Sequence, residues 1–291
     1  MGYRVALMAG VKTYLLSVLV FGVLVIGGSV LLGLDDTTLV HNLAFEDARF
    51  KDCVTHAYNS DETTLAKDIR SLRCDDKSIE SIAGIEQFPN LEELNVGLNN
   101  LAQLDLSKNT ELSKLKVYGN DLTVLDVSSN TKLKTLNISG NQLKYLNLSA
   151  NKALVALDVR NNQLAALDIS VNTALTQIDA RHNQLSELNV DNNINLYVLN
   201  VSHNQLTSLD LSTNVNLNEL LVSDNQLATI RFRDVSKFQR IDLRKNPFSI
   251  EAKAYIETLS VILPVQWGPF ESLYGLTWDG NAKEWASQLQ I

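Results

Sequence analysis

Apolar positions along this chain repeat with a period of 21 residues from Leu91 to Ser236. In each unit, positions 1, 4, 6, 11, 14 and 16 are nearly always Leu, Val or Ile. Two consecutive units are Leu133, Leu136, Ile138, Leu143, Leu146 and Leu148, then Leu154, Leu157, Val159, Leu164, Leu167 and Ile169. A fixed period in this range is typical of a solenoid, in which each unit is one coil stacked on the last. We therefore expect these side chains to form one continuous apolar interior.

Each unit contains a short strand and a second extended segment. Positions 3 to 7 alternate between outward and apolar residues, which is the pattern of a half-buried strand. Strands of successive coils would lie parallel, about 4.8 Å apart. The second half of the unit, as in Leu104–Asn109, is predicted to be extended rather than helical. Because the two sides then have similar spacings, we predict a straight rod of about nine coils, on the order of 40 Å long.

Asparagine marks both turns of the unit. One series follows the strand: Asn99, Asn120, Asn141, Asn162, Asn183, Asn204, Asn225 and Asn246. The other runs ten residues out of phase: Asn109, Asn130, Asn151, Asn172, Asn193 and Asn214. A buried backbone group without a partner costs about 1–3 kcal/mol, and an amide side chain offers both donors and an acceptor. We expect both series to satisfy backbone groups rather than to bind a ligand.

The pattern L-x-x-L-x-L-x-x-N-x-L, as in Leu133–Leu143, resembles the leucine-rich repeat family, and in particular its bacterial, internalin-like branch. The first unit, from Ile69 to Leu91, has the 22-residue spacing of that branch. The resemblance implies an α/β solenoid, which is a right-handed coil with a parallel β-sheet, a mostly extended convex side and helical caps at both ends. It also implies protein or peptide binding on the strand face. Contact residues vary between members of this family, so none is transferred to this chain.

The segments beside the repeats fit caps that cover the apolar ends of a solenoid. Residues 35–68 contain a linker and a predicted helix, Phe45–Tyr58, whose apolar face is Phe50, Cys53, Val54 and Ala57. The repeats span 69–248. Residues 249–267 predict a helix that begins after Ser249 and a closing strand at Val261–Trp267. Both segments resemble the caps of the internalin-like family.

The chain has two cysteines, and both lie near the first coil. Cys53 is on the apolar face of the predicted cap helix, and Cys74 occupies an inward position of the first coil. Outside the cytoplasm, a disulfide between them would tie the cap to the coil and contribute about 3 kcal/mol. Two buried free thiols are the alternative. No His or Asn pairing motif surrounds either residue, which argues against a catalytic thiol.

The N-terminal part contains a long uncharged stretch, residues 14–34. As a helix it would extend about 31 Å, enough to cross the hydrocarbon core of a membrane. Arg4 and Lys12 precede it and acidic residues follow, so the positive-inside rule puts residues 1–13 in the cytoplasm. We expect a single-pass signal anchor in the cytoplasmic membrane, with the C-terminal domain outside the cytoplasm, in the periplasm or at the cell surface. Secretion after cleavage of a signal peptide is the alternative.

Composition limits the classes of function. The net charge of −8 argues against a nucleic-acid partner. Two cysteines and four histidines are too few for a zinc framework, and no nucleophile, phosphate-binding or zinc-protease motif occurs. A column of His182, His203 and Asp224 is a weak metal candidate, because side chains that step by about 4.8 Å converge only partly on one ion. We predict no catalytic residues, no cofactor and no metal.

The outward strand positions vary from coil to coil, as a binding scaffold allows and as surface drift also allows. One cluster on this strand face is a lattice of opposite charges: Asp158, Arg160, Asp179 and Arg181. A solvated surface network, which contributes little to stability, explains such a lattice as well as binding does.

A second cluster on the strand face is apolar. Tyr197, Val198 and Leu221 stand where polar residues are expected, and exposed apolar groups ringed by polar ones often mark an interface. Tyr118 is a further candidate contact for a protein ligand.

Residues 268–291 form an aromatic arm that carries Trp278 and Trp285. The arm either folds over the last coil or docks another protein. Taken together, the sequence predicts a non-enzymatic, membrane-anchored module that mediates protein–protein interaction outside the cytoplasm, with membrane contact through residues 14–34. The alternative function is a structural spacer or envelope scaffold whose C-terminal arm docks a partner complex.

Overall fold

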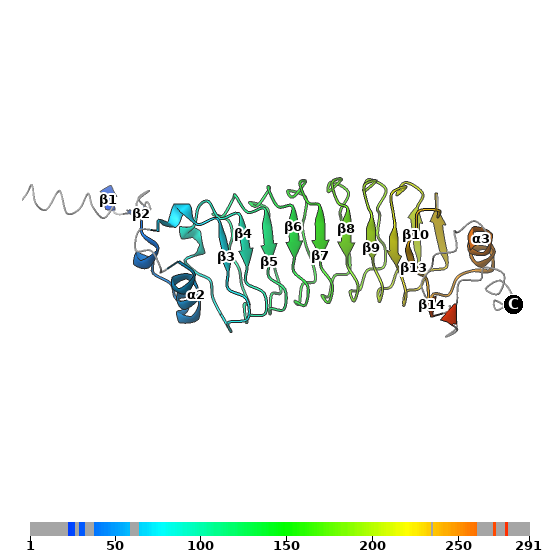
Figure 1. The fold of residues 1–291 in the computed structure, drawn as a ribbon, viewed down its shortest axis with the longest axis horizontal. Helices are drawn as coiled ribbons and strands as arrows, with labels where there is room; N and C mark the ends of the chain where they lie inside the picture. Colours follow the sequence, from blue (N-terminus) through cyan, green and yellow to red (C-terminus); the bar gives the residue numbers. More distant parts are fainter. Residues whose placement is uncertain are drawn as a thin grey trace, which may run out of the picture.

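The computed structural model describes residues 38–58, 64–233 and 235–260, together with four short strands nearer the two ends. Its main feature is a solenoid whose coils are stacked along a nearly straight axis (Figure 1). One side of the solenoid is a nine-stranded parallel sheet. Its strands are β3 (Ser71–Arg73), β4 (Glu93–Asn95), β5 (Lys114–Lys116), β6 (Thr135–Asn137), β7 (Ala156–Asp158), β8 (Gln177–Asp179), β9 (Val198–Asn200), β11 (Glu219–Leu221) and β13 (Arg240–Asp242). The predicted solenoid with a parallel sheet is confirmed.

The register of the sheet follows the sequence period. Leu136 of β6 lies opposite Leu157 of β7, a step of 21 residues, whereas Ser71 of β3 lies opposite Glu93 of β4, a step of 22. Leu136, Leu157 and Ile178 are all at most 2% exposed. Equivalent apolar side chains of successive coils therefore stack in one buried interior, as the repeat predicts.

The convex side is extended, as predicted. From residue 91 to residue 246, the described coils contain no helix. Near the C-terminal end, β10 (Ser208–Leu211) and β12 (Thr229–Phe232) even pair as a small parallel sheet on this side. The first coil differs, because it contains a short 3-10 helix, η3 (Ile85–Gln87). The extended segments let the convex side keep the spacing of the strands, so the rod stays straight.

An N-terminal cap covers the first coil. It contains α2 (Ala48–Tyr58) and two short 3-10 helices, η1 (Val40–Asn42) and η2 (Ala66–Asp68). Asp47 Oδ1 accepts hydrogen bonds from the N–H groups of Arg49 and Phe50, at 2.7 and 3.0 Å, and so fixes the start of the helix. Phe50, Cys53 and Val54 are buried as predicted, but Ala57 is exposed, and in this last turn of α2 it is Tyr58 that packs against the core.

A disulfide joins this cap to the solenoid. Cys53 of α2 and Cys74 of the first coil are bonded, with their Cα atoms 5.8 Å apart. The predicted disulfide is therefore confirmed, and the alternative of two free thiols is not. Because it closes a loop of 21 residues, it is expected to stabilise the fold by about 3 kcal/mol.

The helix α3 (Ile250–Ser260) follows the last coil. Ser249 Oγ accepts a hydrogen bond from the N–H of Ala252 at 3.1 Å, the capping contact expected at the start of this helix. Tyr255 of α3 donates its hydroxyl to the carbonyl of Phe232 at 3.0 Å, which attaches the helix to β12. The strand predicted at Val261–Trp267 lies outside the described residues.

Among the described residues, the structure does not show the helix that the sequence predicts in the N-terminal span. A helix was expected at 14–34, but the described parts of this range are two antiparallel strands, β1 (Val23–Ile26) and β2 (Ser29–Leu32). Most of their residues are Val, Ile or Leu, and β-branched side chains favour strands. The rest of 14–34 lies outside the described residues. No helix among the described residues combines the length and the apolar character needed to cross a membrane.

Candidate functional site

The outward face of the sheet is hollowed into a shallow groove of about 400 Å³ that runs from β5 to β13. The alternation along each strand creates it, because every second side chain points into the core and the others point out. The outward residues that line it are Lys116, Thr135, Asn137, Ala156, Asp158, Gln177, Asp179, Arg181, Val198, Asn200, Glu219, Leu221 and Arg240. We refer to it as the sheet-face groove.

Three residues of the charge lattice predicted from the sequence, Asp158, Asp179 and Arg181, line the middle of this groove. Asp158 and Asp179 are direct neighbours across β7 and β8. Arg160 bridges them, with Nε 3.5 Å from Asp158 Oδ2 and Nη1 3.7 Å from Asp179 Oδ2. Arg181 adds a contact of 3.5 Å to Asp179. The four side chains therefore neutralise one another on the sheet.

Burial changes the electrostatics of the lattice. Loss of solvent raises the pKa of Asp158, and this effect outweighs the lowering by the Arg160 guanidinium. The carboxylate also accepts a hydrogen bond from the N–H of Arg160 at 3.3 Å. A ligand that brings a cation to this point would therefore meet a carboxylate that is partly desolvated and already oriented.

The apolar part of the sheet-face groove lies toward its C-terminal end. Val198 and Leu221 are half-buried and line the groove together. Leu221 sits between Asn200 and Asp242 on the neighbouring strands. Beside them Arg240 Nη1 lies 2.8 Å from Glu219 Oε1. Val198 and Leu221 are therefore an apolar pair with polar neighbours, and their role in an interface stays a prediction.

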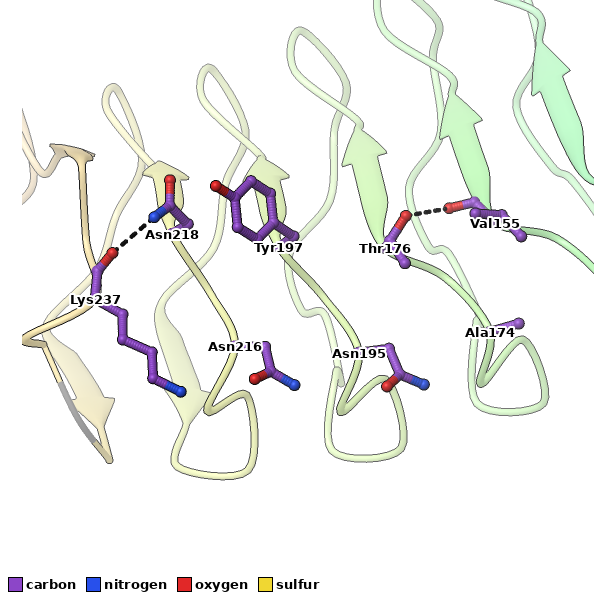
Figure 2. A pocket seen from close by; sticks show the side chains of 8 residues that line it. All are labelled: Val155, Ala174, Thr176, Asn195, Tyr197, Asn216, Asn218 and Lys237. Atoms are coloured by element: carbon purple, nitrogen blue, oxygen red, sulfur yellow. Dashed lines mark hydrogen bonds between the residues drawn. The ribbon is translucent and has the colours of Figure 1, made fainter.

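Tyr197 does not join that apolar pair. Its side chain is 46% exposed and lines a different groove, on the flank of the solenoid just before the strands begin (Figure 2). The sequence grouped Tyr197 with Val198 because they are adjacent. The structure separates them, since consecutive side chains along an extended segment point in different directions.

Tyr118 lies at the N-terminal part of the sheet face and is half-buried. Its ring covers Gly97 of the preceding coil, where an added Cβ would collide with the ring. The glycine thus makes room for the aromatic side chain. Tyr118 therefore packs against the preceding coil, and only part of its side chain is accessible to a ligand.

The column of His182, His203 and Asp224 is a stack rather than a chelate. The two imidazole rings are parallel, with centroids 4.1 Å apart. His203 Nδ1 lies 3.6 Å from Asp224 Oδ2, and Lys245 Nζ lies 3.0 Å from the other carboxylate oxygen. No cluster of three or more potential metal ligands occurs among the described residues.

The aromatic arm is described only in part. Phe270–Glu271 (β14) and Thr277–Trp278 (β15) form a short antiparallel pair in which Phe270 lies opposite Trp278. Trp285 lies outside the described residues.

Sequence reasoning missed the groove that Tyr197 lines, which we call the flank groove. A signal for it was present: two columns of outward positions, just before the strands, contain no charged residue over several consecutive coils. These columns are Val155, Thr176, Tyr197 and Asn218, and Ala153, Ala174, Asn195 and Asn216. These positions precede the strands, so the alternation along the strands does not extend to them.

Comparisons with known proteins agree with this architecture. A family described as the leucine-rich repeat domain of the endo-β-N-acetylglucosaminidase EndoS matches residues 45–172. No curated protein matches the sequence.

Solved structures with the same fold include two internalins from Listeria monocytogenes. InlF is 19% identical, with a TM-score of 0.60, and the match covers 77% of this chain and 82% of InlF. Internalin C2 is 24% identical, with a TM-score of 0.60, and covers 70% of this chain and 93% of its own. YopM, a leucine-rich effector protein from Yersinia pestis, is 25% identical with a TM-score of 0.53. The match covers 68% of this chain and 52% of YopM, so the chain spans about half of that protein.

Proposed function

Since this chain is a leucine-rich repeat protein with the internalin-like fold, we propose that it is a non-enzymatic module that binds a protein or peptide in its sheet-face groove. The observation that carries this proposal is the groove itself, which extends across the strands from β5 to β13 and joins an apolar pair to a charged centre. Stacked coils fix the positions of these side chains, so a ligand loses little binding energy to ordering of the protein.

The apolar pair is the proposed anchor. Val198 and Leu221 offer half-buried aliphatic surface, and a ligand side chain that covers them would remove this surface from water at about 25 cal/mol per Å². The Asp158–Arg181 lattice next to it would select ligands with complementary charges, because a mismatched charge would be desolvated without a partner.

A paired substitution tests this site. The variant Val198→Asp with Leu221→Asp puts two charges where the ligand is proposed to bury apolar groups, and we expect it to lose its protein partner. Val124→Asp is the matched control, because Val124 is 71% exposed and does not line the groove. Affinity capture with quantitative mass spectrometry, followed by calorimetry with each purified candidate, measures the effect. An unchanged set of partners in the double variant would contradict the proposal.

We also propose that the module works outside the cytoplasm. The Cys53–Cys74 disulfide supports this, because structural disulfides persist mainly in oxidising compartments. The uncharged residues 14–34 support export by a retained anchor or by a cleaved signal. Cell fractionation with mass spectrometry of the mature N-terminus distinguishes the two. A chain found in the cytoplasm with reduced cysteines would overturn this part of the proposal.

The spacer alternative makes a different prediction. If the arm docks the partner, deletion of residues 268–291 abolishes capture, while the Val198 and Leu221 double variant captures normally. The two sets of variants therefore separate a binding face from a spacer.

A further inference from the structure

The flank groove, defined by Val155, Ala174, Thr176, Asn195, Tyr197, Asn216, Asn218 and Lys237, is a second concave surface of the solenoid. Figure 2 shows its side chains in two rows that run across successive coils. One row is Val155, Thr176, Tyr197 and Asn218, and the other is Ala174, Asn195, Asn216 and Lys237. The groove has a volume of about 700 Å³, which is in the range of sites for extended small ligands.

Apart from Lys237 at its C-terminal end, the side chains that line this groove are uncharged. Lys132 and Lys134 occupy the equivalent positions on its N-terminal side, and Lys237 closes the C-terminal end. Between these positions both rows contain only apolar, hydroxyl, amide and phenol side chains, although a fifth of the whole chain is charged (20%). The sheet-face groove, in contrast, has the charged residues Asp158, Asp179 and Arg181 in its middle. A ligand for the flank groove therefore needs no net charge.

The amides of the groove are held in place. Asn195 Nδ2 donates to the carbonyl of Thr173 at 3.1 Å, and Asn216 Nδ2 donates to the carbonyl of Ile194 at 3.3 Å. Each bond uses one of the two amide hydrogens. Both side chains are exposed, so each presents its remaining N–H and its carbonyl oxygen to the groove in a fixed orientation.

Tyr197 supplies an aromatic surface beside these amides. Tyr197 is 46% exposed, and its ring stands between Thr176 and Asn218 in its row (Figure 2). The face of an aromatic ring carries partial negative charge, so it attracts the weakly positive C–H groups of a flat apolar surface. Small neighbours, Ala174 and Thr176, leave space in front of it.

We propose that the flank groove binds a neutral oligosaccharide. A sugar ring has one apolar C–H face, which stacks on Tyr197, and a rim of hydroxyl groups, which both donate to and accept from the Asn195 and Asn216 amides. Asn195 and Asn216 are equivalent residues of successive coils, about 4.8 Å apart, so neighbouring sugar units can each contact an amide while one unit stacks on Tyr197. A peptide is less well matched, because its charged side chains find no partner between Lys134 and Lys237.

The test titrates the full chain with a panel of neutral hexasaccharides, built from N-acetylglucosamine, from β-1,4-linked glucose, from β-1,3-linked glucose and from mannose. Calorimetry and saturation-transfer NMR measure binding. We expect at least one of them to bind, and Tyr197→Ala to weaken it by about tenfold or more. Tyr197→Phe keeps the ring and is expected to retain most of the affinity. Because the ligand is neutral, its affinity is expected to stay constant between about 0.05 M and about 0.5 M NaCl.

Two controls separate this site from others. Tyr145→Ala removes a tyrosine that is 69% exposed elsewhere on the solenoid, and Val198→Asp alters only the sheet-face groove. Both are expected to leave saccharide affinity unchanged, and Tyr197→Ala is expected to leave protein capture unchanged. The proposal is overturned if no hexasaccharide binds, if Tyr197→Ala and Tyr145→Ala have equal effects, or if Tyr197→Ala abolishes capture of a protein instead.

Discussion

In the coils from Leu91 to Asn214, both turns carry an asparagine, but the two turns use its side chain differently. In the turn after the strand, Asn162 is both donor and acceptor. Its Nδ2 donates to the carbonyls of Ile138 and Val159, both at 3.0 Å, and its Oδ1 accepts from the N–H of Leu143 at 3.0 Å. Because Ile138 and Leu143 belong to the preceding coil, one side chain satisfies backbone groups of two coils.

In the turn after the convex segment, the asparagine is only a donor. Asn172 Nδ2 donates to the carbonyls of Leu148 and Asn151, at 3.1 and 2.8 Å. Its Oδ1 is buried and has no hydrogen-bond partner among the described residues, and the same holds for the other members of this series. A buried acceptor without a partner is unfavourable, so this column contributes less to stability than the first.

The two turns also differ in their backbone φ angles. The residue before each asparagine of the first series has a positive φ, from Leu98 at 53° to Gly140 at 64°. Within the repeats, the described residues of the second turn have no positive φ. The first turn is therefore the sharper one, and it needs both the asparagine and a left-handed residue. The two asparagine series have the same spacing in the sequence, but the turns that they occupy differ in structure.

Asn162→Ala is the substitution with the largest expected effect. It leaves the buried N–H of Leu143 without an acceptor and removes one of two side-chain donors from Ile138 O and from Val159 O. We expect a loss of about 3 kcal/mol in the free energy of unfolding, mainly from the orphaned donor. Urea denaturation of the full chain, followed by circular dichroism, measures it.

Asn172→Ala is the matched comparison, since the same atoms are removed from another buried site. Leu148 O and Asn151 O both keep a backbone hydrogen bond, and the unpaired Oδ1 disappears with the side chain. We expect a loss of only about 1–2 kcal/mol. Equal losses in the two variants would mean that the unpaired oxygen is bound to water in solution and that the two turns are equivalent.

A smaller effect is expected at the left-handed position of the first turn. Gly140 has φ of 64°, and an added Cβ would make only ordinary contacts, at 3.5 Å or more. Gly140→Ala therefore isolates backbone strain and is expected to cost about 1 kcal/mol. Leu98→Gly, at the equivalent position, relieves the same strain. Thermal unfolding of both variants measures whether Gly140→Ala lowers the stability. A stabilised Gly140→Ala would contradict this account.

Much of this architecture could be predicted from the sequence, because period and burial are linked. Leu136 and Leu157 recur at one position since each must fill the same space between coils. The burial of both asparagine columns followed from the same reasoning. Their difference did not, because the unpaired oxygen of Asn172 depends on which backbone N–H groups the turn leaves within reach. Periodicity carries no such information.

The candidate sites were less predictable for a related reason. Val198 and Leu221 could be placed on the outward face because the strand alternation tells which side chains point outward. Tyr197 precedes its strand, where alternation gives no direction, so it was assigned to the wrong group. Likewise, the uncharged residues around Val23 and Leu31 satisfy the composition of a membrane helix, but their β-branched content also suits the strands β1 and β2.

The smallest effect is expected at the stacked histidines of the first turn. Burial, then the neighbouring His203, lowers the pKa of His182 below its ordinary value of 6.5. The unfolded chain therefore takes up a proton first as the pH falls through about 6.5, and stability is lost between that pH and the folded pKa. NMR titration of the imidazole C–H signals measures the pKa directly. In His203→Gln the pKa of His182 is expected to rise, because a like charge 4.1 Å away between ring centroids is removed. If the pKa of His182 stays unchanged in this variant, the two imidazole rings do not stack in solution.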